Sequence, residues 1–340
     1  MKNISILEIS FSSKNQRFIE RLKAALNSLK YTTISKNYSG IKAKTSLLGP
    51  LKINNIAKKQ KGDEFYICLD KFDSADIYLA NDGVQKIYKK LYKFWFLSFS
   101  NFIAGQIEKK CVQNATKIIA NSNLTRFGLE TVYNLDPNKL VTIYPGITPP
   151  IQIQKGRAKM RLCNELGLNM ELPIMLFVSD DFRADGAREF IELLSRLETK
   201  VNALIIGSDK DVLKYRKIAQ NLGVTVIFRP SQTIMNHYYE AADIFVLPSH
   251  YNSFSNQLLE ALSYGCACFT TEQNGASEIL GSEFVMKNAS DQSIDGYINL
   301  LLTDHDLLLE ISGQNSEIAR EFSVEKNLNE ILKVIGENIH

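Results

Sequence analysis

Short apolar runs alternate with amphipathic segments along the whole chain. In the first half, the runs that predict strands are residues 4–9, 31–35, 64–69, 76–80, 117–120 and 140–144. In the second half, they are residues 173–179, 202–207, 224–228, 243–248, 266–271 and 283–286. Short apolar runs are typical of strands, whereas apolar residues three or four positions apart indicate helices. Strands that alternate with helices predict parallel, doubly wound sheets of the α/β class.

Amphipathic helices are expected between these strands. Residues 14–29 and 187–197 each place their apolar side chains on one helical face. Residues 84–112 give the longest helical pattern, with aromatic residues on one side and lysines on the other. The lysines that share this face are Lys86, Lys89, Lys90 and Lys93. Such a helix suits the surface of an anionic membrane, and it equally suits a domain whose aromatic residues pack inward beneath a solvated basic face.

A break in composition divides the chain near its middle. Residues 144–155 hold three prolines and one glycine, and 340 residues exceed the usual size of a single core. We therefore predict two Rossmann-like, doubly wound domains, residues 1–150 and 151–340, that face each other, with the last helix able to pack back on the first domain. A ligand is expected between them, at the carboxyl ends of the strands.

The net charge of +3 hides an uneven distribution. Residues 1–150 carry 23 Lys and Arg against 11 Asp and Glu, and the remaining residues carry 17 against 26. One half is thus basic and the other acidic, which suggests two different binding surfaces. A basic surface could bind nucleic acid, but no nucleic-acid-binding motif accompanies it, so no nucleic-acid partner is predicted.

Other classes of protein are excluded by what the sequence lacks. No apolar run approaches the ~18–20 residues that span a bilayer, and the first ten residues have no signal-peptide pattern. The five cysteines form no CxxC pair, so neither a zinc site nor a disulfide framework is expected, and the cytoplasm is the predicted compartment. There is no GxGxxG motif and no P-loop. The D-x-D sequence at residues 209–211 is more consistent with helix capping than with metal binding.

The stretch of residues 250–280 carries the most information about chemistry. Ser253 and Ser255 can cap a helix expected from Asn256 to about residue 264. The N-terminus of a helix presents unpaired N–H groups, which suit a phosphate or sugar hydroxyls. Glu260 lies one turn in, on the same side as Asn256, and could bond a ribose diol. The same pattern also fits a well-capped surface helix with an exposed glutamate.

This stretch resembles the C-terminal domain of the retaining GT-B glycosyltransferases of family 4, especially the lipopolysaccharide core glucosyltransferases. The resemblance rests on Glu260 with the residues 261–265 (ALSYG) that follow it, and on residues 274–278 (NGASE). It continues in both directions, at residues 75–84, 119–122, 144–147, 179–186, 204–207 and 241–243. It implies a GT-B fold and metal-independent transfer of a hexose from a UDP- or GDP-sugar, with no cofactor, to a glycolipid or surface glycan. The resemblance also implies that the protein acts at the cytoplasmic face of the membrane, as a peripheral membrane protein.

The resemblance also implies roles for individual residues. Phe228–Ser231 would border the base, and Glu260 would hold the ribose. The residues implied to bind the donor are Arg183, Asp185, Phe254, Ser255, Asn256 and Glu260. The residues at catalytic positions are Asp82, Gln85 and Asn252.

Three of these positions depart from the family pattern. Asp185 stands where the family has a lysine that neutralises the diphosphate, Asn252 where it has an acidic residue, and Gln85 where it commonly has a histidine. Amides orient hydroxyl groups, but they neither accept a proton nor stabilise a cation as a carboxylate does. The alternative function is therefore that of a catalytically degenerate relative that acts as a binding or scaffold protein.

Overall fold

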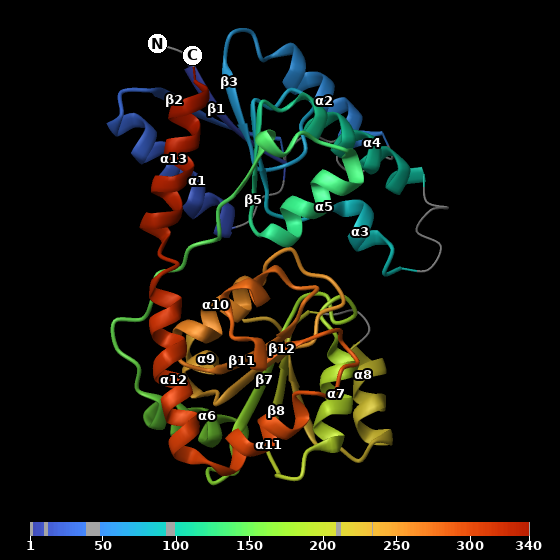
Figure 1. Cartoon of the computed structure of the whole chain (residues 1–340), viewed down its shortest axis with the longest axis vertical. Coiled ribbons are helices and arrows are strands. Elements are labelled where there is room, and N and C mark those ends of the chain that lie inside the picture. The colour runs from blue at the N-terminus through green and yellow to red at the C-terminus, as the bar shows by residue number, and fades with distance from the viewer. Residues whose placement is uncertain are drawn as a thin grey trace. The chain divides into compact units, whose positions relative to one another are not determined.

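The protein consists of two compact α/β units (Figure 1). The computed structural model describes residues 3–9, 13–38, 48–92, 99–208, 212–232 and 234–339. Unit 1 comprises residues 1–144 and 325–340, and unit 2 comprises residues 145–324. The change of unit thus follows Tyr144, where the sequence analysis placed it after residue 150, and the C-terminal residues belong to unit 1.

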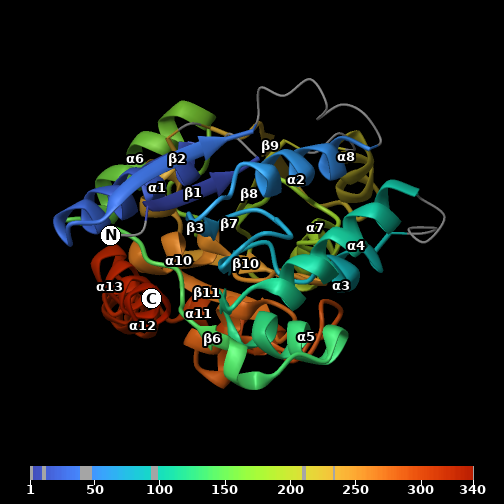
Figure 2. The ribbon, with the colours of Figure 1, turned by 90° about the horizontal axis from the view of Figure 1, so that it is seen from above.

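Unit 1 is built on a parallel six-stranded sheet in the order β2-β1-β3-β4-β5-β6. Its strands are β1 (Asn3–Glu8), β2 (Thr32–Asn37), β3 (Phe65–Cys68), β4 (Ile77–Ala80), β5 (Lys117–Ala120) and β6 (Leu140–Thr142). Its helices are α1 (Ser13–Ser28), α2 (Gly49–Lys59), α3 (Gln85–Lys89), α4 (Phe99–Asn114), α5 (Asn123–Tyr133) and α13 (Val324–Asn338). Figure 2 shows β2, β1 and β3 side by side.

Unit 2 has a second parallel six-stranded sheet, in the order β12-β11-β10-β7-β8-β9. Its strands are β7 (Ile174–Val178), β8 (Asn202–Ile206), β9 (Val226–Arg229), β10 (Ile244–Leu247), β11 (Ala267–Thr271) and β12 (Val285–Met286). Its helices are α6 (Lys155–Leu166), α7 (Ala187–Arg196), α8 (Val212–Asn221), α9 (Asn236–Ala241), α10 (Asn256–Ser263), α11 (Asp295–Thr303) and α12 (His305–Arg320). All twelve predicted strands are confirmed, most of them within two residues at each end.

The long helix predicted over residues 84–112 is wrong. α3 ends at Lys89, and the next residues close tighter turns, in which the N–H groups of Lys90, Leu91 and Tyr92 each bond the carbonyl three residues back. Such i→i−3 bonds do not continue the α-helical ladder. α4 then begins at Phe99. Lys86, Lys89 and Lys90 therefore lie on or directly after a helix of five residues, and Lys93 lies outside the described residues.

The C-terminal helix completes the core of unit 1. On α13, Ile331, Val334 and Ile335 are buried and join an apolar cluster that includes Ile19 and Leu22 of α1. The helix thus adds side chains from the far end of the sequence to the core of unit 1. Because the core of unit 1 contains side chains from both α1 and α13, this core is complete only when α13 is docked.

Candidate functional site

The site in unit 2 lies where the winding of the sheet changes direction. β7 is followed by β8 on one side and is bordered by β10 on the other, so the chain leaves β7 and β10 toward opposite faces. In an open parallel sheet, ligands bind outside the carboxyl ends of two such strands. Ser179 directly follows β7, and Ser249 is the second residue after β10; both side chains are buried.

Asp185 joins the two loops at this point. Its Oδ2 accepts a hydrogen bond from Ser179 Oγ at 2.6 Å. Its Oδ1 accepts from Ser249 Oγ at 3.1 Å and from Asn252 Nδ2 at 2.9 Å. Burial raises the pKa of this carboxyl, and the three donors act in the opposite direction. A buried charge is costly unless it is hydrogen-bonded, and all three donors to this carboxylate come from the protein.

Glycine allows these loops to approach each other. Gly186 has φ +78°, and a Cβ on it would lie 2.0 Å from the Pro248 carbonyl oxygen. Directly after β8, a Cβ on Gly207 would lie 1.8 Å from the Ser179 carbonyl oxygen. Both positions exclude any side chain, because backbone atoms cannot retreat as a flexible side chain can. The backbone contact at Gly186 brings Asp185 within reach of the β10–α10 loop.

Asn252 uses both ends of its amide. Nδ2 donates to Asp185, and Oδ1 accepts from the N–H of Phe254 at 3.2 Å. Its backbone forms an isolated parallel bridge to Asn274, through bonds with Gln273 and Gly275. Asn252 is thus a fixed part of the loop that leads into α10.

The N-terminus of α10 is capped as the sequence predicted. Ser255 Oγ accepts from the N–H of Leu258 at 3.1 Å. The Asn274 side chain supports the same turn, because its Oδ1 accepts from the N–H groups of Ser255 and Ala276. Its Nδ2 donates to Ser249 Oγ and Thr270 Oγ1. Asn274 therefore connects the β10–α10 loop to β11 and to the turn that follows Asn274 itself, a role that its place in a sequence motif does not reveal.

The donor-binding candidates differ widely in exposure. Phe254 and Ser255 are buried, Glu260 and Asn252 are half-buried, and Asn256 and Arg183 are exposed. Phe228, at the expected base edge, lies under the Arg216 guanidinium at 5.3 Å, and Ser231 Oγ donates to Asp180 at 2.7 Å. Among the described residues of the site, the side chains that contact one another therefore belong mainly to the loops. Asn256 and Arg183 are exposed to solvent.

Glu260 has a partner that the sequence analysis missed. The hydroxyl of Tyr239, which is buried on α9, hydrogen-bonds Glu260. Burial, followed by the charge of Glu260 and this hydrogen bond, raises the pKa of Tyr239 well above its ordinary value. The neutral hydroxyl therefore stays a donor and orients the carboxylate. A lone tyrosine on an amphipathic helix gives no sequence signal for such a role.

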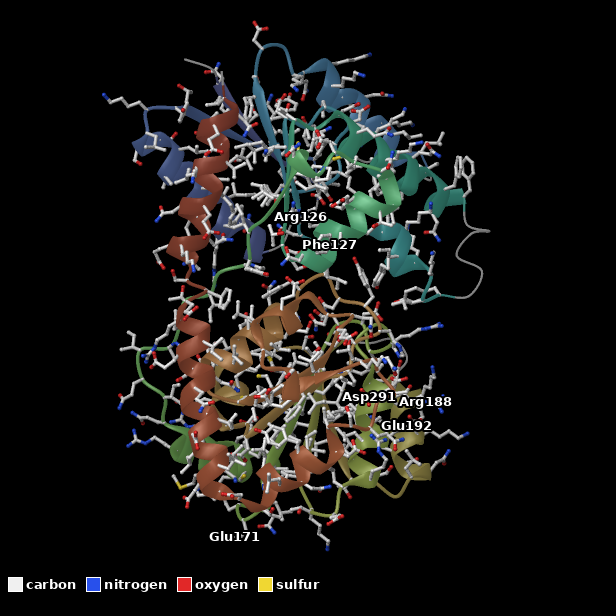
Figure 3. The ribbon with its side chains drawn as sticks, viewed as in Figure 1. Arg126, Phe127, Glu171, Arg188, Glu192 and Asp291 are labelled. Atoms are coloured by element: carbon white, nitrogen blue, oxygen red, sulfur yellow. The ribbon has the colours of Figure 1, made fainter. Side chains whose placement is uncertain are left out.

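His250 and Glu189 form an ion pair beside the site. His250 Nε2 lies 3.1 Å from Glu189 Oε1, and the His250 N–H donates to the Ala184 carbonyl at 2.7 Å. The hydrogen bond that His250 donates to Glu189 raises the pKa of His250, while burial and the charge of Arg183 lower it. Arg188 is exposed on α7 and donates to Glu192 at 2.7 Å (Figure 3).

The two candidates in unit 1 lie beside a buried charge cluster. Glu108 is fully buried and accepts from the Gln85 N–H at 3.1 Å and from the Tyr133 hydroxyl. Lys71 Nζ lies 3.7 Å from Glu108 and 3.9 Å from Asp82, whose side chain is 73% exposed. Asp82 and the N-terminus of α3 thus share one structural support, and Glu108 and Lys71 are functional-site neighbours that the sequence analysis missed.

Comparison with known proteins finds similarity to a known family within unit 2. Residues 160–318 match the family model of the glycosyl transferases group 1. The D-inositol 3-phosphate glycosyltransferase of Xylanimonas cellulosilytica is 23% identical over 210 residues, which are 58% of this chain and 49% of that protein. The N-acetyl-alpha-D-glucosaminyl L-malate synthase of Bacillus anthracis is 23% identical over 179 residues, 47% of this chain and 46% of that protein. This chain spans about half the length of the curated relatives it matches.

Solved structures match the whole chain. WaaG, a glycosyltransferase involved in lipopolysaccharide biosynthesis, superposes with a TM-score of 0.79 at 17% identity and covers 98% of this chain and 99% of its own. HepE of Anabaena, solved with UDP and glucose, has a TM-score of 0.73 at 15% identity and covers 99% and 100%. The fold is GT-B. The expected α/β class and its two doubly wound sheets are thereby confirmed.

Proposed function

We propose that this protein is a retaining glycosyltransferase that moves a hexose from a nucleotide sugar to a glycan or glycolipid. The observation that carries the proposal is the capped N-terminus of α10 with Glu260 one turn in, at the switch point of unit 2. It is supported by the group 1 match over the same residues and by HepE, a similar structure solved with UDP and glucose. Membership of family 4 and of its lipopolysaccharide core branch is part of this proposal.

The diphosphate and the ribose of the donor each have a proposed partner. The first N–H groups of α10 and its dipole would offset the diphosphate charge without a metal or other cofactor. Glu260, oriented by Tyr239, would accept hydrogen bonds from the ribose hydroxyls. Arg183 is the exposed cation of the β7–α7 loop and would pair with the diphosphate. These contacts fit a UDP- or GDP-hexose as the donor.

The reaction exchanges one bond at the anomeric carbon for another. The bond to the diphosphate oxygen breaks, an acceptor hydroxyl oxygen bonds the same carbon, and the hydroxyl proton leaves with the nucleoside diphosphate or to a base. In unit 1, Asp82 is the exposed carboxylate among the candidates and would bind the acceptor. Asn252 and Gln85 are amides and would orient hydroxyl groups.

One observation favours the second candidate function, that of a binding or scaffold protein. Both ends of the Asn252 amide are already bonded to the protein, and the Asp185 carboxylate is enclosed by side-chain donors. A site that binds a nucleotide sugar but lacks a reactive group would retain affinity without turnover. Binding and turnover therefore have to be measured separately.

The acceptor and the membrane belong to the same proposal. Lys86 and Lys90 are exposed and Lys89 is half-buried, and the basic half of the chain would approach an anionic membrane or a phosphorylated glycolipid at its cytoplasmic face. Within the described residues, no helix is both long and apolar enough to cross a bilayer.

Calorimetry with UDP, GDP and their hexose conjugates, followed by nucleotide release with a glycolipid in anionic vesicles, tests the proposal. We expect micromolar binding of one nucleotide and turnover only when the acceptor is present. Glu260→Gln should weaken binding at least tenfold. Glu171→Gln, which changes an exposed residue before β7 (Figure 3), is the matched control. Absence of binding at millimolar nucleotide would refute the transferase function, and binding without release would select the second.

A further inference from the structure

We propose that Asp185 is a positioning residue that fixes Asn252 and, through it, the chain entering α10. For its consequence on nucleotide binding, this inference rests on the proposed function. Asp185 lies in the β7–α7 loop and Asn252 in the β10–α10 loop, 67 residues later. The single carboxylate thus ties together two loops that leave the sheet on opposite sides of the switch point.

The geometry leaves Asp185 no part in direct ligand contact. One oxygen is occupied by Ser179, and the other by Ser249 and Asn252, at 2.6 to 3.1 Å. The residue is 9% exposed. A carboxylate that faced a diphosphate would repel it, whereas here the charge is enclosed by three donors. Its effect on a nucleotide therefore acts through the groups that it holds.

The carboxylate also selects the orientation of the Asn252 amide. A carboxylate only accepts hydrogen bonds, so Asn252 has to present Nδ2 to it. This leaves Asn252 Oδ1 for the N–H of Phe254, directly before the Ser255 cap of α10. Without Asp185, the nitrogen end of the amide loses its acceptor, and only the Phe254 N–H still distinguishes the two ends.

A second set of contacts, through Ser249 and Asn274, holds the same arrangement. Ser249 Oγ donates to Asp185 and accepts from Asn274 Nδ2, and Asn274 Oδ1 receives the Ser255 N–H. Two chains of hydrogen bonds thus run from Asp185 to the start of α10, one through Asn252 and one through Ser249 and Asn274. Networks of this kind favour one loop conformation when every member is paired.

Asp185→Ala and Asp185→Asn separate positioning from charge. The alanine removes all three acceptor contacts. The asparagine keeps an oxygen for Asn252 and Ser249 and can donate its amide to the Ser179 hydroxyl, but it has no charge. We expect hydrogen exchange of residues 252–258 to be at least tenfold faster in the alanine variant and within about threefold of the parent in the asparagine variant.

Nucleotide affinity provides the second measurement. Asp185→Ala should weaken the nucleotide found by calorimetry about tenfold, and Asp185→Asn should restore most of that loss. The double variant Asp185→Ala with Asn252→Ala should bind no more weakly than Asp185→Ala alone, because the two residues act as one unit. Glu171→Gln is again the control.

The outcomes are distinguishable. Unchanged exchange at residues 252–258 in Asp185→Ala, or equal losses in the alanine and asparagine variants, would overturn the inference, as would additive losses in the double variant. If Asp185→Ala does not fold, Ser249→Ala removes one of the three donors and should accelerate the same amides. If the parent binds no nucleotide, the proposed function fails while the exchange measurement still decides the positioning role.

Discussion

At the scale of single residues, the site combines groups whose charge depends on pH with groups whose charge is enclosed. His250 and Glu189 are partly open to solvent, and their ion pair joins the β10–α10 loop to the first turn of α7. Asp185 lies four residues before Glu189 in the chain, and its carboxylate accepts hydrogen bonds from three side-chain donors. The exposed fraction of each side chain thus decides which of these residues changes its charge when the solvent pH changes near neutrality.

The His250–Glu189 pair should add stability within a defined pH window. The pKa of Glu189 is lowered from 4.5, so its contribution is present above that value and is lost as the pH falls through the lowered pKa. The pKa of His250 is raised from 6.5, so its contribution is present below that value and is lost as the pH rises through the raised pKa. The pair therefore stabilises most between about pH 4.5 and 6.5.

His250→Gln should lower the free energy of unfolding more at pH 5.5 than at pH 9. The difference should stay below about 1 kcal/mol, because the His250 side chain is 37% exposed and water screens the pair. Urea unfolding at the two pH values measures it, with Glu171→Gln as the control for loss of one exposed ionisable group. An equal loss at both pH values would contradict the ion-pair interpretation.

At the scale of elements, local patterns predict strands and capped helices well and predict breaks in helices poorly. The Ser255 cap and the bounds of α10 follow from a few neighbouring residues. The end of α3 at Lys89 does not, since the sequence after it keeps a helical pattern of apolar residues. Glycines are an exception, because the residue type itself marks positions where a positive φ and a close backbone contact leave no room for a side chain.

Gly186→Ala should destabilise unit 2 by about 2–4 kcal/mol, because a Cβ would meet the Pro248 carbonyl and the residue has φ +78°. Gly167→Ala is the matched control: it has φ +66° but open space around its Cβ, so its cost should be about 1 kcal/mol. Urea unfolding of both variants gives the comparison. Equal losses would show that the backbone contact at Gly186 is unimportant.

At the scale of the whole molecule, the first unit is completed by the end of the chain. Ile335 on α13 is fully buried in the cluster that contains Leu22 of α1. The amphipathic pattern of the last helix indicates that one of its faces is buried, but many docking surfaces would satisfy that pattern. The choice of unit 1 depends on the shape of its core.

Ile335→Ala should therefore destabilise unit 1 by about 2–5 kcal/mol and leave unit 2 unaffected. Hydrogen exchange of β1 and β3 amides, compared with those of β7 and β8, resolves the two units. Glu337→Ala, at an exposed position on the same helix, is the control. Faster exchange in β7 and β8 would show that α13 stabilises unit 2, and it would contradict this prediction.

The sequence by itself determined what depends on neighbouring residues: the twelve strands, the cap of α10, the basic and acidic halves, and the motifs of a GT-B protein. These features follow from local apolar periodicity, backbone chemistry and residue type. Only the tertiary structure decided that Asp185 faces Asn252, that Tyr239 orients Glu260, and that α13 belongs to unit 1. Each of these contacts joins side chains from separate elements, and their geometry is fixed by sheet order and loop packing, which no local pattern encodes.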